Sequence, residues 1–251
     1  MKILGSDWDG TFLHGGIDEK KLLAVKKWRD AGNKFGIVTG RAPDFRDRLI
    51  EYYPNFEYDF LATCNGGYII DGDGNVLYKL SFESLDVPTL VGDLFSWGCI
   101  YAFIVANEQI CAVTYPDARP KYIDPSRAFL LEDLPSVTDV YQVSVMLESA
   151  EEAEIIVGKL RESYNGKLNP LQNSRCIDIV PCGVNKAEGL YRLTEIFGAN
   201  PSDVIAVGDN INDVDMLREF RSFAMENGVE QIKGLVDGTV GDVTEILINE
   251  I

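Results

Sequence analysis

The fold is decided by the stretch Lys2-Ile3-Leu4-Gly5-Ser6-Asp7-Trp8-Asp9-Gly10-Thr11 near the start of the chain. Its first five residues are apolar enough for a buried strand, and the carboxylates of Asp7 and Asp9 follow at once. In an open parallel sheet, ligands bind beyond the carboxyl ends of the strands. There, one carboxylate can act as a nucleophile while the other donates and accepts a proton, and Gly10 permits a turn tight enough for the backbone to approach a ligand. Taken alone, the stretch also fits an acidic turn after a strand.

Strands and helices alternate along both ends of the chain. Asp18 can cap a helix that reaches about Ala31, where Gly32 stops it. The pattern next predicts a strand over Lys34–Thr39, a helix from Pro43 to about Tyr53 and a strand over Asp59–Thr63. Towards the C-terminus it predicts a helix over Lys186–Phe197, a strand over Val204–Val207 and a helix over Asn212–Phe220. This alternation indicates an α/β fold with a Rossmann-like parallel-sheet core.

The middle of the chain departs from that alternation. A hairpin is expected around Asp71–Asn75, followed by a mixture that indicates an inserted α+β domain with an antiparallel sheet. The elements expected there are a helix near Val87–Trp97, strands near Ile100–Val105 and Gln109–Tyr115, a proline-rich loop from Pro116 to Pro135, a strand near Val140–Leu147 and a helix near Glu151–Tyr164. We therefore predict a catalytic core of residues 1–81 and 176–251 and a cap of residues 82–175.

Composition narrows the possible partners. The 251 residues carry a net charge of −17, from 40 acidic and 23 basic side chains, and such a surface repels nucleic acid and anionic lipid. An anionic substrate would need a site with its own positive charge. Five cysteines without C-x-x-C spacing and a single histidine argue against disulfides or zinc, and favour buried or half-buried thiols in a reducing compartment. We expect a cytoplasmic monomer or weak homo-oligomer that acts on a small molecule.

Three further motifs follow strands or open helices of the alternating part. The segment Thr39-Gly40-Arg41 offers a hydroxyl and backbone N–H groups to a phosphate oxygen, although it also fits an ordinary helix cap. Lys186, beside Asn185, opens a helix, where the helix dipole disfavours a cation unless an anion lies close; the alternative is a solvated surface lysine. Asp209 and Asp213 stand four residues apart and suit Mg²⁺, or simply cap a helix.

Together, in this order, the motifs resemble those of the haloacid-dehalogenase-like (HAD) superfamily: D-x-D-G-T, a strand ending in Thr, a Lys, and G-D-x-x-N-D. More narrowly, Asn65-Gly66-Gly67 and the segment Asp178–Lys186 are similar to segments of the Cof-type subfamily, which carries a large cap inserted late in the core. The resemblance covers nearly the whole chain. It departs at Trp8, where the family has a small aliphatic residue, and in the tail Thr239–Ile251, which lacks the usual glycine-rich acidic ending.

The resemblance implies a role for each matching residue. Asp7 would attack phosphorus, and Asp9 would protonate the leaving oxygen and later activate water. Mg²⁺ would be held by the Asp7 carboxylate, the Asp9 carbonyl and Asp209, with Asp213 close by. The residues expected on the phosphate and substrate are Thr39, Gly40, Arg41, Asn65, Gly66, Lys186 and Asn212.

The function that follows is a Mg²⁺-dependent phosphatase for a small phosphate monoester such as a sugar phosphate, working through an aspartyl-phosphate. A sugar phosphomutase and a non-catalytic phosphate sensor on the same fold stay open as alternatives.

Several other features are expected to be structural. We read Asp71–Asn75 and Asp237–Thr239 as turns, His14 as a surface residue, and Trp97, Tyr101 and Phe103 as cap core.

Overall fold

The computed structural model describes residues 1–106, 109–115, 125–134 and 137–251. The chain divides into two compact units, which are described separately below. The core unit comprises Met1–Arg41, Phe45–Lys79 and Asn185–Ile251, and the insert unit comprises Ala42–Asp44 and Leu80–Val184. Among the described residues, every helix is too short or too polar to cross a bilayer.

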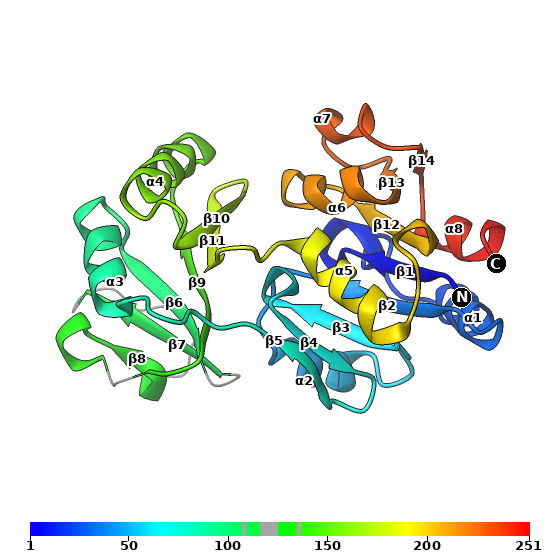
Figure 1. The fold of residues 1–251 in the computed structure, drawn as a ribbon, viewed down its shortest axis with the longest axis horizontal. Helices are drawn as coiled ribbons and strands as arrows, with labels where there is room; N and C mark the ends of the chain where they lie inside the picture. Colours follow the sequence, from blue (N-terminus) through cyan, green and yellow to red (C-terminus); the bar gives the residue numbers. More distant parts are fainter. Residues whose placement is uncertain (107–108, 116–124, 135–136) are drawn as a thin grey trace. The chain divides into compact units, whose positions relative to one another are not determined.

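The core unit is built on one eight-stranded sheet with the order β14-β13-β12-β1-β2-β3-β4-β5 (Figure 1). The six strands from β14 to β3 are parallel, and β4 and β5 complete the sheet as an antiparallel hairpin. The strands are β1 Ile3–Ser6, β2 Lys34–Val38, β3 Phe60–Thr63, β4 Tyr68–Asp71, β5 Val76–Lys79, β12 Val204–Gly208, β13 Arg221–Met225 and β14 Gly238–Val240.

The central strands are buried along their whole length, as their apolar sequences predict. Because β1 lies between β12 and β2, the chain runs to one side of β1 first and returns on the other side much later. The carboxyl ends of these three strands therefore lie at the point where the strand order reverses, which is where open α/β sheets bind their ligands.

Helices cover both faces of this sheet. Leu190 and Leu193 of α5, with Met216 and Leu217 of α6, join the hydrophobic cluster on one face. Helices α1 and α8 lie against each other, and Trp28 of α1 donates its indole N–H to the Lys34 carbonyl. The helices are α1 Glu19–Asp30, α2 Phe45–Tyr52, α5 Lys186–Phe197, α6 Val214–Glu219, α7 Glu230–Lys233 and α8 Val243–Asn249.

The insert unit is a six-stranded sheet with the order β10-β11-β9-β6-β7-β8, antiparallel except for the short β8. Apolar side chains of α3 and α4 and of alternate strand residues form its hydrophobic core. Its elements are α3 Val87–Ser96, β6 Tyr101–Ala106, β7 Gln109–Thr114, β8 Ala128–Phe129, β9 Val140–Met146, α4 Ala150–Ser163, β10 Leu168–Asn173 and β11 Cys176–Pro181. Half of the predicted loop from Pro116 to Pro135 lies outside the described residues, and the described half contains the short strand β8 and two 3₁₀ turns.

The fold class is as predicted, an α/β core with an inserted α+β unit, but the expected boundary at residue 176 is wrong. Strand β11 pairs with β9 and β10 in the insert sheet, so the insert extends to Val184. Strand β10 was missed altogether. It is the edge strand of its sheet and carries Pro170, which an edge strand tolerates.

Four smaller expectations also fail. Gly238 and Thr239 lie in strand β14 rather than in a turn. Tyr101 and Phe103 alternate with the core residues of β6, so they point to the other face of the insert sheet, whereas Trp97 packs on the core as predicted. Helix α2 begins two residues after Pro43, at Phe45. Finally, Cys182 is exposed rather than buried.

Candidate active site

Asp7 stands where β1 ends, with its side chain almost fully buried. Its backbone N–H donates to the Val207 carbonyl of the neighbouring strand β12 at 2.9 Å, which continues the parallel ladder by one residue. The chain then turns through a π-helical segment, Trp8–Phe12, and the Phe12 N–H returns to the Asp7 carbonyl at 3.1 Å. The Asp7 carboxylate is thus fixed at the crevice between β1 and β12.

Lys186 meets this carboxylate from the first turn of α5. The helix is capped by Asn185, whose side chain accepts the Glu188 N–H at 2.8 Å. The Lys186 side chain is wholly buried, and its ammonium donates to Asp7 Oδ1 at 2.5 Å and to Asp213 Oδ1 at 2.6 Å. The interpretation of Lys186 as a solvated surface residue is therefore excluded, and the two carboxylates supply the anions that a cation at a helix start requires.

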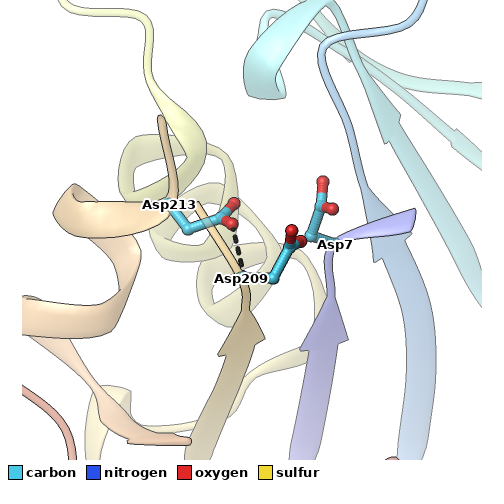
Figure 2. A group of neighbouring side chains, drawn as sticks. All are labelled: Asp7, Asp209 and Asp213. Atoms are coloured by element: carbon cyan, nitrogen blue, oxygen red, sulfur yellow. Dashed lines mark hydrogen bonds between the residues drawn. The ribbon is translucent and has the colours of Figure 1, made fainter. Parts of the chain in front are cut away.

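Asp209 and Asp213 complete an acidic group with Asp7. Figure 2 shows the carboxylates of Asp7 and Asp209 side by side beyond the ends of β1 and β12, with Asp213 approaching from the following turn. One carboxylate oxygen from each of the three lies within 4.8 Å of the others. Asp213 Oδ2 accepts the backbone N–H of Asp209 at 3.0 Å and that of Asn210 at 3.1 Å, and Thr11 donates its hydroxyl to Asp209 Oδ1 at 2.6 Å.

The charges of this group do not balance. Burial raises the pKa of the Asp7 carboxyl well above its usual range; the nearby Asp213 and Asp209 charges raise it further, and the Lys186 ammonium opposes them. Burial also raises the pKa of Asp209, against the hydrogen bond from Thr11. Burial by itself would lower the pKa of Lys186, but Asp213 and Asp7 outweigh it, so that pKa lies above its usual value. Three carboxylates facing one ammonium leave excess negative charge, and hard oxygen donors of this kind fit Mg²⁺.

Two glycines allow the backbone to come this close to the acidic group. Gly10 adopts a positive φ of 79°, and a Cβ on it would lie 2.4 Å from Asp209 Oδ2. A Cβ on Gly208 would lie 2.5 Å from the Asp213 carboxylate. Asn227 donates its side-chain N–H to the Gly10 carbonyl at 2.9 Å and so holds the turn from the outside. The predicted role of Gly10 in a tight turn is confirmed.

Arg41 forms hydrogen bonds with both Asp9 and Thr39. The Arg41 guanidinium donates to Asp9 Oδ2 at 2.8 Å through Nε and to Asp9 Oδ1 at 2.7 Å through Nη2. The buried Thr39 hydroxyl accepts the Arg41 backbone N–H at 3.2 Å. Gly40, which stands between Thr39 and Arg41 in the sequence, is half-buried.

Asn65 and Gly66 occupy a buried turn directly after β3. The Asn65 N–H donates to the Thr39 carbonyl at 2.9 Å, which joins this turn to the end of β2. A Cβ on Gly66 would lie 2.7 Å from the Asn185 carbonyl oxygen and 3.0 Å from the Gly189 Cα, so α5 packs backbone to backbone on the turn. The turn therefore supports the helix that presents Lys186. A direct contact of Asn65 or Gly66 with substrate stays a prediction.

Comparisons with known proteins agree with this geometry. The family model described as haloacid dehalogenase-like hydrolase matches residues 4–246. The chain belongs to the haloacid dehalogenase-like hydrolase family. It is 38% identical over 265 residues to the 5-amino-6-(5-phospho-D-ribitylamino)uracil phosphatase YitU of Bacillus subtilis, with 94% of this chain and 91% of that protein covered. It is 24% identical to the pyridoxal phosphate phosphatase YbhA of Escherichia coli, with 97% and 94% covered.

The solved structure of SMU.1108c from Streptococcus mutans UA159 superposes with a TM-score of 0.84, covering 100% of this chain and 98% of that one at 19% identity, which shows a shared fold. The predicted resemblance, with its Cof-type assignment, is confirmed. The prediction that the chain is a phosphatase is confirmed at the level of the family and its relatives.

In this haloacid dehalogenase-like hydrolase two residues contribute to the site without a predicted role. Thr11 belongs to the first motif and bonds Asp209, whereas Asn227 lies far along the chain from Gly10, so no local pattern indicates its contact. Asn212 lies half-buried in the 3₁₀ turn Ile211–Asp213 that leads into α6. The Asp71–Asn75 segment is a hairpin turn as predicted: Asp71 accepts the N–H groups of Asp73 and Asn75, and the hydrogen bonds from Asn75 lower its pKa. His14 is exposed, also as predicted.

Proposed function

We propose that this chain is a Mg²⁺-dependent phosphatase that hydrolyses a small phosphate monoester through an aspartyl-phosphate on Asp7. The observation that carries the proposal is the position of the Asp7 carboxylate. It lies at the carboxyl end of the central strand, bonded to the ammonium of Lys186, and it forms with Asp209 and Asp213 a group able to hold a cation. A carboxylate approaching a phosphate dianion needs such positive charge on both sides, because the two anions otherwise repel.

The hydrogen bonds of the carboxylates support an assignment of the metal ligands. Lys186 contacts Asp7 Oδ1 and Thr11 contacts Asp209 Oδ1, so we assign the second oxygen of each carboxylate to Mg²⁺. Both oxygens of Asp213 already accept hydrogen bonds, from Lys186 and from the backbone around Asp209. Asp213 therefore orients its neighbours more than it binds the ion. When bound, Mg²⁺ would screen the charge of the phosphoryl oxygens.

The residues then divide the reaction. An Asp7 oxygen forms a bond to phosphorus as the bond from phosphorus to the leaving oxygen breaks, with the electron pair staying on that oxygen. Asp9 delivers the proton that the leaving oxygen takes up. In the second step Asp9 removes a proton from a water whose oxygen bonds to phosphorus, while the bond from phosphorus to the Asp7 oxygen breaks; this frees the Asp7 carboxylate and releases inorganic phosphate. Lys186 and the Thr39 hydroxyl hold the phosphoryl oxygens.

The substrate class follows from the relatives and from the charge. Two relatives aligned over nearly the whole chain are named as phosphatases of a phosphoribitylamino-uracil and of pyridoxal phosphate. Each of those names describes a small phosphate ester rather than a polymer. A net charge of −17 also repels a polyanion, so we propose a metabolite-sized ester and no nucleic-acid partner.

We expect phosphate release from p-nitrophenyl phosphate and from a panel of sugar, polyol and pyridoxal phosphates to require Mg²⁺. Removal of the ion with EDTA should reduce the rate by at least about 100-fold, because it leaves the buried carboxylates facing the phosphate dianion without screening. Added Mg²⁺ should restore the rate in full.

The same assay distinguishes the alternatives. Turnover that persists unchanged in EDTA would contradict the metal assignment. Absence of phosphate release from the whole panel with every divalent ion would favour the non-catalytic sensor. Transfer of the phosphoryl group to a second sugar hydroxyl, with no free phosphate, would favour the mutase.

A further inference from the structure

Among the residues that the structure describes, Arg41 is the ion-pair partner of Asp9. Its carboxylate is 57% exposed, and it accepts two parallel hydrogen bonds, of 2.8 and 2.7 Å, from the fork of Arg41. An exposed ion pair of this kind contributes little to stability. A bidentate guanidinium–carboxylate pair does, however, fix the plane and direction of the carboxylate.

Arg41 is itself fixed at both ends. Its backbone N–H donates to the Thr39 hydroxyl and its carbonyl accepts the Cys64 N–H at 2.8 Å, so the main chain is tied to two loops of the crevice. Its guanidinium lies over the ring of Phe45, 4.8 Å from the ring centroid. The stacked ring limits the positions that the long, otherwise mobile arginine side chain can take.

Trp8 packs against the ring of Phe45. Its side chain is buried and meets Phe45 edge to face, with centroids 5.0 Å apart and planes at 68°, and it also contacts Tyr53 at 5.8 Å and Phe56 at 5.9 Å. A small aliphatic residue at position 8 could not reach all three rings. Trp8, the residue at which the first motif departs from the family, thus contacts Phe45, the ring on which Arg41 lies.

We infer that Arg41 is a positioning residue that aims the Asp9 carboxylate, and that Phe45 and Trp8 brace it for this task. The inference rests on the proposed role of Asp9 as proton donor and acceptor. A misaligned Asp9 costs most when the leaving oxygen is a strong base, since a weakly basic leaving group departs with little help from a proton. The dependence of the rate on the leaving group is therefore the quantity to measure.

The experiment measures kcat/KM for a series of phosphate monoesters, from p-nitrophenyl phosphate through less acidic phenols to an alkyl phosphate. We expect Arg41→Met to reduce kcat/KM for the alkyl ester by about 10- to 100-fold and for p-nitrophenyl phosphate by less than about 3-fold, because only the first requires an aligned acid. Arg41→Lys, which retains the charge without the fork, should behave almost like Arg41→Met. Phe45→Leu and Trp8→Leu should also make kcat/KM depend more steeply on the leaving group, but less strongly: we expect a loss of about 2- to 5-fold on the alkyl ester.

Arg46→Met is the matched control. Arg46 follows Phe45 on α2 and donates to the Asp73 carbonyl, so its removal should leave the series unchanged. A uniform loss in Arg41→Met across all esters would overturn the inference, because it would mean that Arg41 binds the phosphate itself. An unchanged series in Arg41→Met, or full activity of Arg41→Lys, would overturn it as well.

Asp9→Asn separates this inference from the proposed function. It should steepen the series strongly, and adding Arg41→Met to it should steepen the series no further. If Asp9→Asn leaves the series unchanged, the proposed role of Asp9 fails. If Asp9→Asn behaves as expected and the double variant steepens further, only the role of Arg41 fails. Melting temperatures for all variants exclude unfolding as the cause.

Discussion

Asp7→Asn is expected to lose at least about 10³-fold in kcat/KM for every ester that the wild-type protein hydrolyses, since removal of a nucleophile abolishes the covalent route. The substitution is nearly isosteric, and the backbone bond from residue 7 to the Val207 carbonyl does not depend on the side chain. The protein should therefore stay folded while phosphate release from p-nitrophenyl phosphate falls to background.

The chain provides its own control for this variant. Asp71 begins a similar Asp-Gly-Asp-Gly stretch, but it is the last residue of β4 and its carboxylate accepts the N–H of Asn75 in the turn to β5. Asp71→Asn should retain full turnover. A rate for Asp7→Asn within about ten-fold of the Asp71→Asn rate would contradict the assignment of the nucleophile.

Lys186→Met is expected to combine the second largest loss of activity with a loss of stability. Without the ammonium, Asp7 and Asp213 remain as buried carboxylates with no cation between them, which destabilises proteins by about 3–5 kcal/mol. The phosphoryl oxygens also lose a fixed positive charge, so kcat should fall by about 10²- to 10³-fold. Urea unfolding in EDTA and turnover in saturating Mg²⁺ measure the two effects separately.

A double variant separates the structural role of Lys186 from its chemical role. Adding Asp213→Asn removes one of the two stranded carboxylates, so part of the lost unfolding free energy should return. Activity should stay as low as in Lys186→Met, because the positive charge is still missing. A Lys186→Met protein with wild-type stability would show that the buried pair is not formed, and recovery of turnover in the double variant would contradict the role of Lys186 in the reaction.

The parts of the site that could be predicted share one property, namely that each is local in the sequence. Asp7 and Asp209 directly follow buried parallel strands, whose continuous apolar runs are visible in the sequence, and the carboxyl ends of adjacent strands meet at one edge of the sheet. Asp18 precedes a helix and caps it, as predicted. Local sequence rules were sufficient to predict these features. The order of the motifs along the chain then indicated the family.

The features that were missed depend on contacts between distant segments. The pairing of Arg41 with Asp9 and the packing of Gly66 on Gly189 join residues from different elements, and no local pattern distinguishes them from solvated or turn residues. Strand β10 was missed because Asn, Pro and Gln interrupt its apolar pattern, which only an edge strand tolerates. Strand β14 has three residues, too few for a period to be recognised.

The central claim is that Asp7 becomes phosphorylated, and trapping that intermediate tests it most directly. Protein mixed with substrate and Mg²⁺ is quenched in acid within one turnover and reduced with borohydride, which converts an aspartyl-phosphate to homoserine, and its peptides are then analysed by mass spectrometry. Homoserine at position 7, absent when Mg²⁺ or substrate is omitted, is the predicted result. Turnover without any modification of Asp7, or with the modification at another carboxylate such as Asp209, would contradict the account.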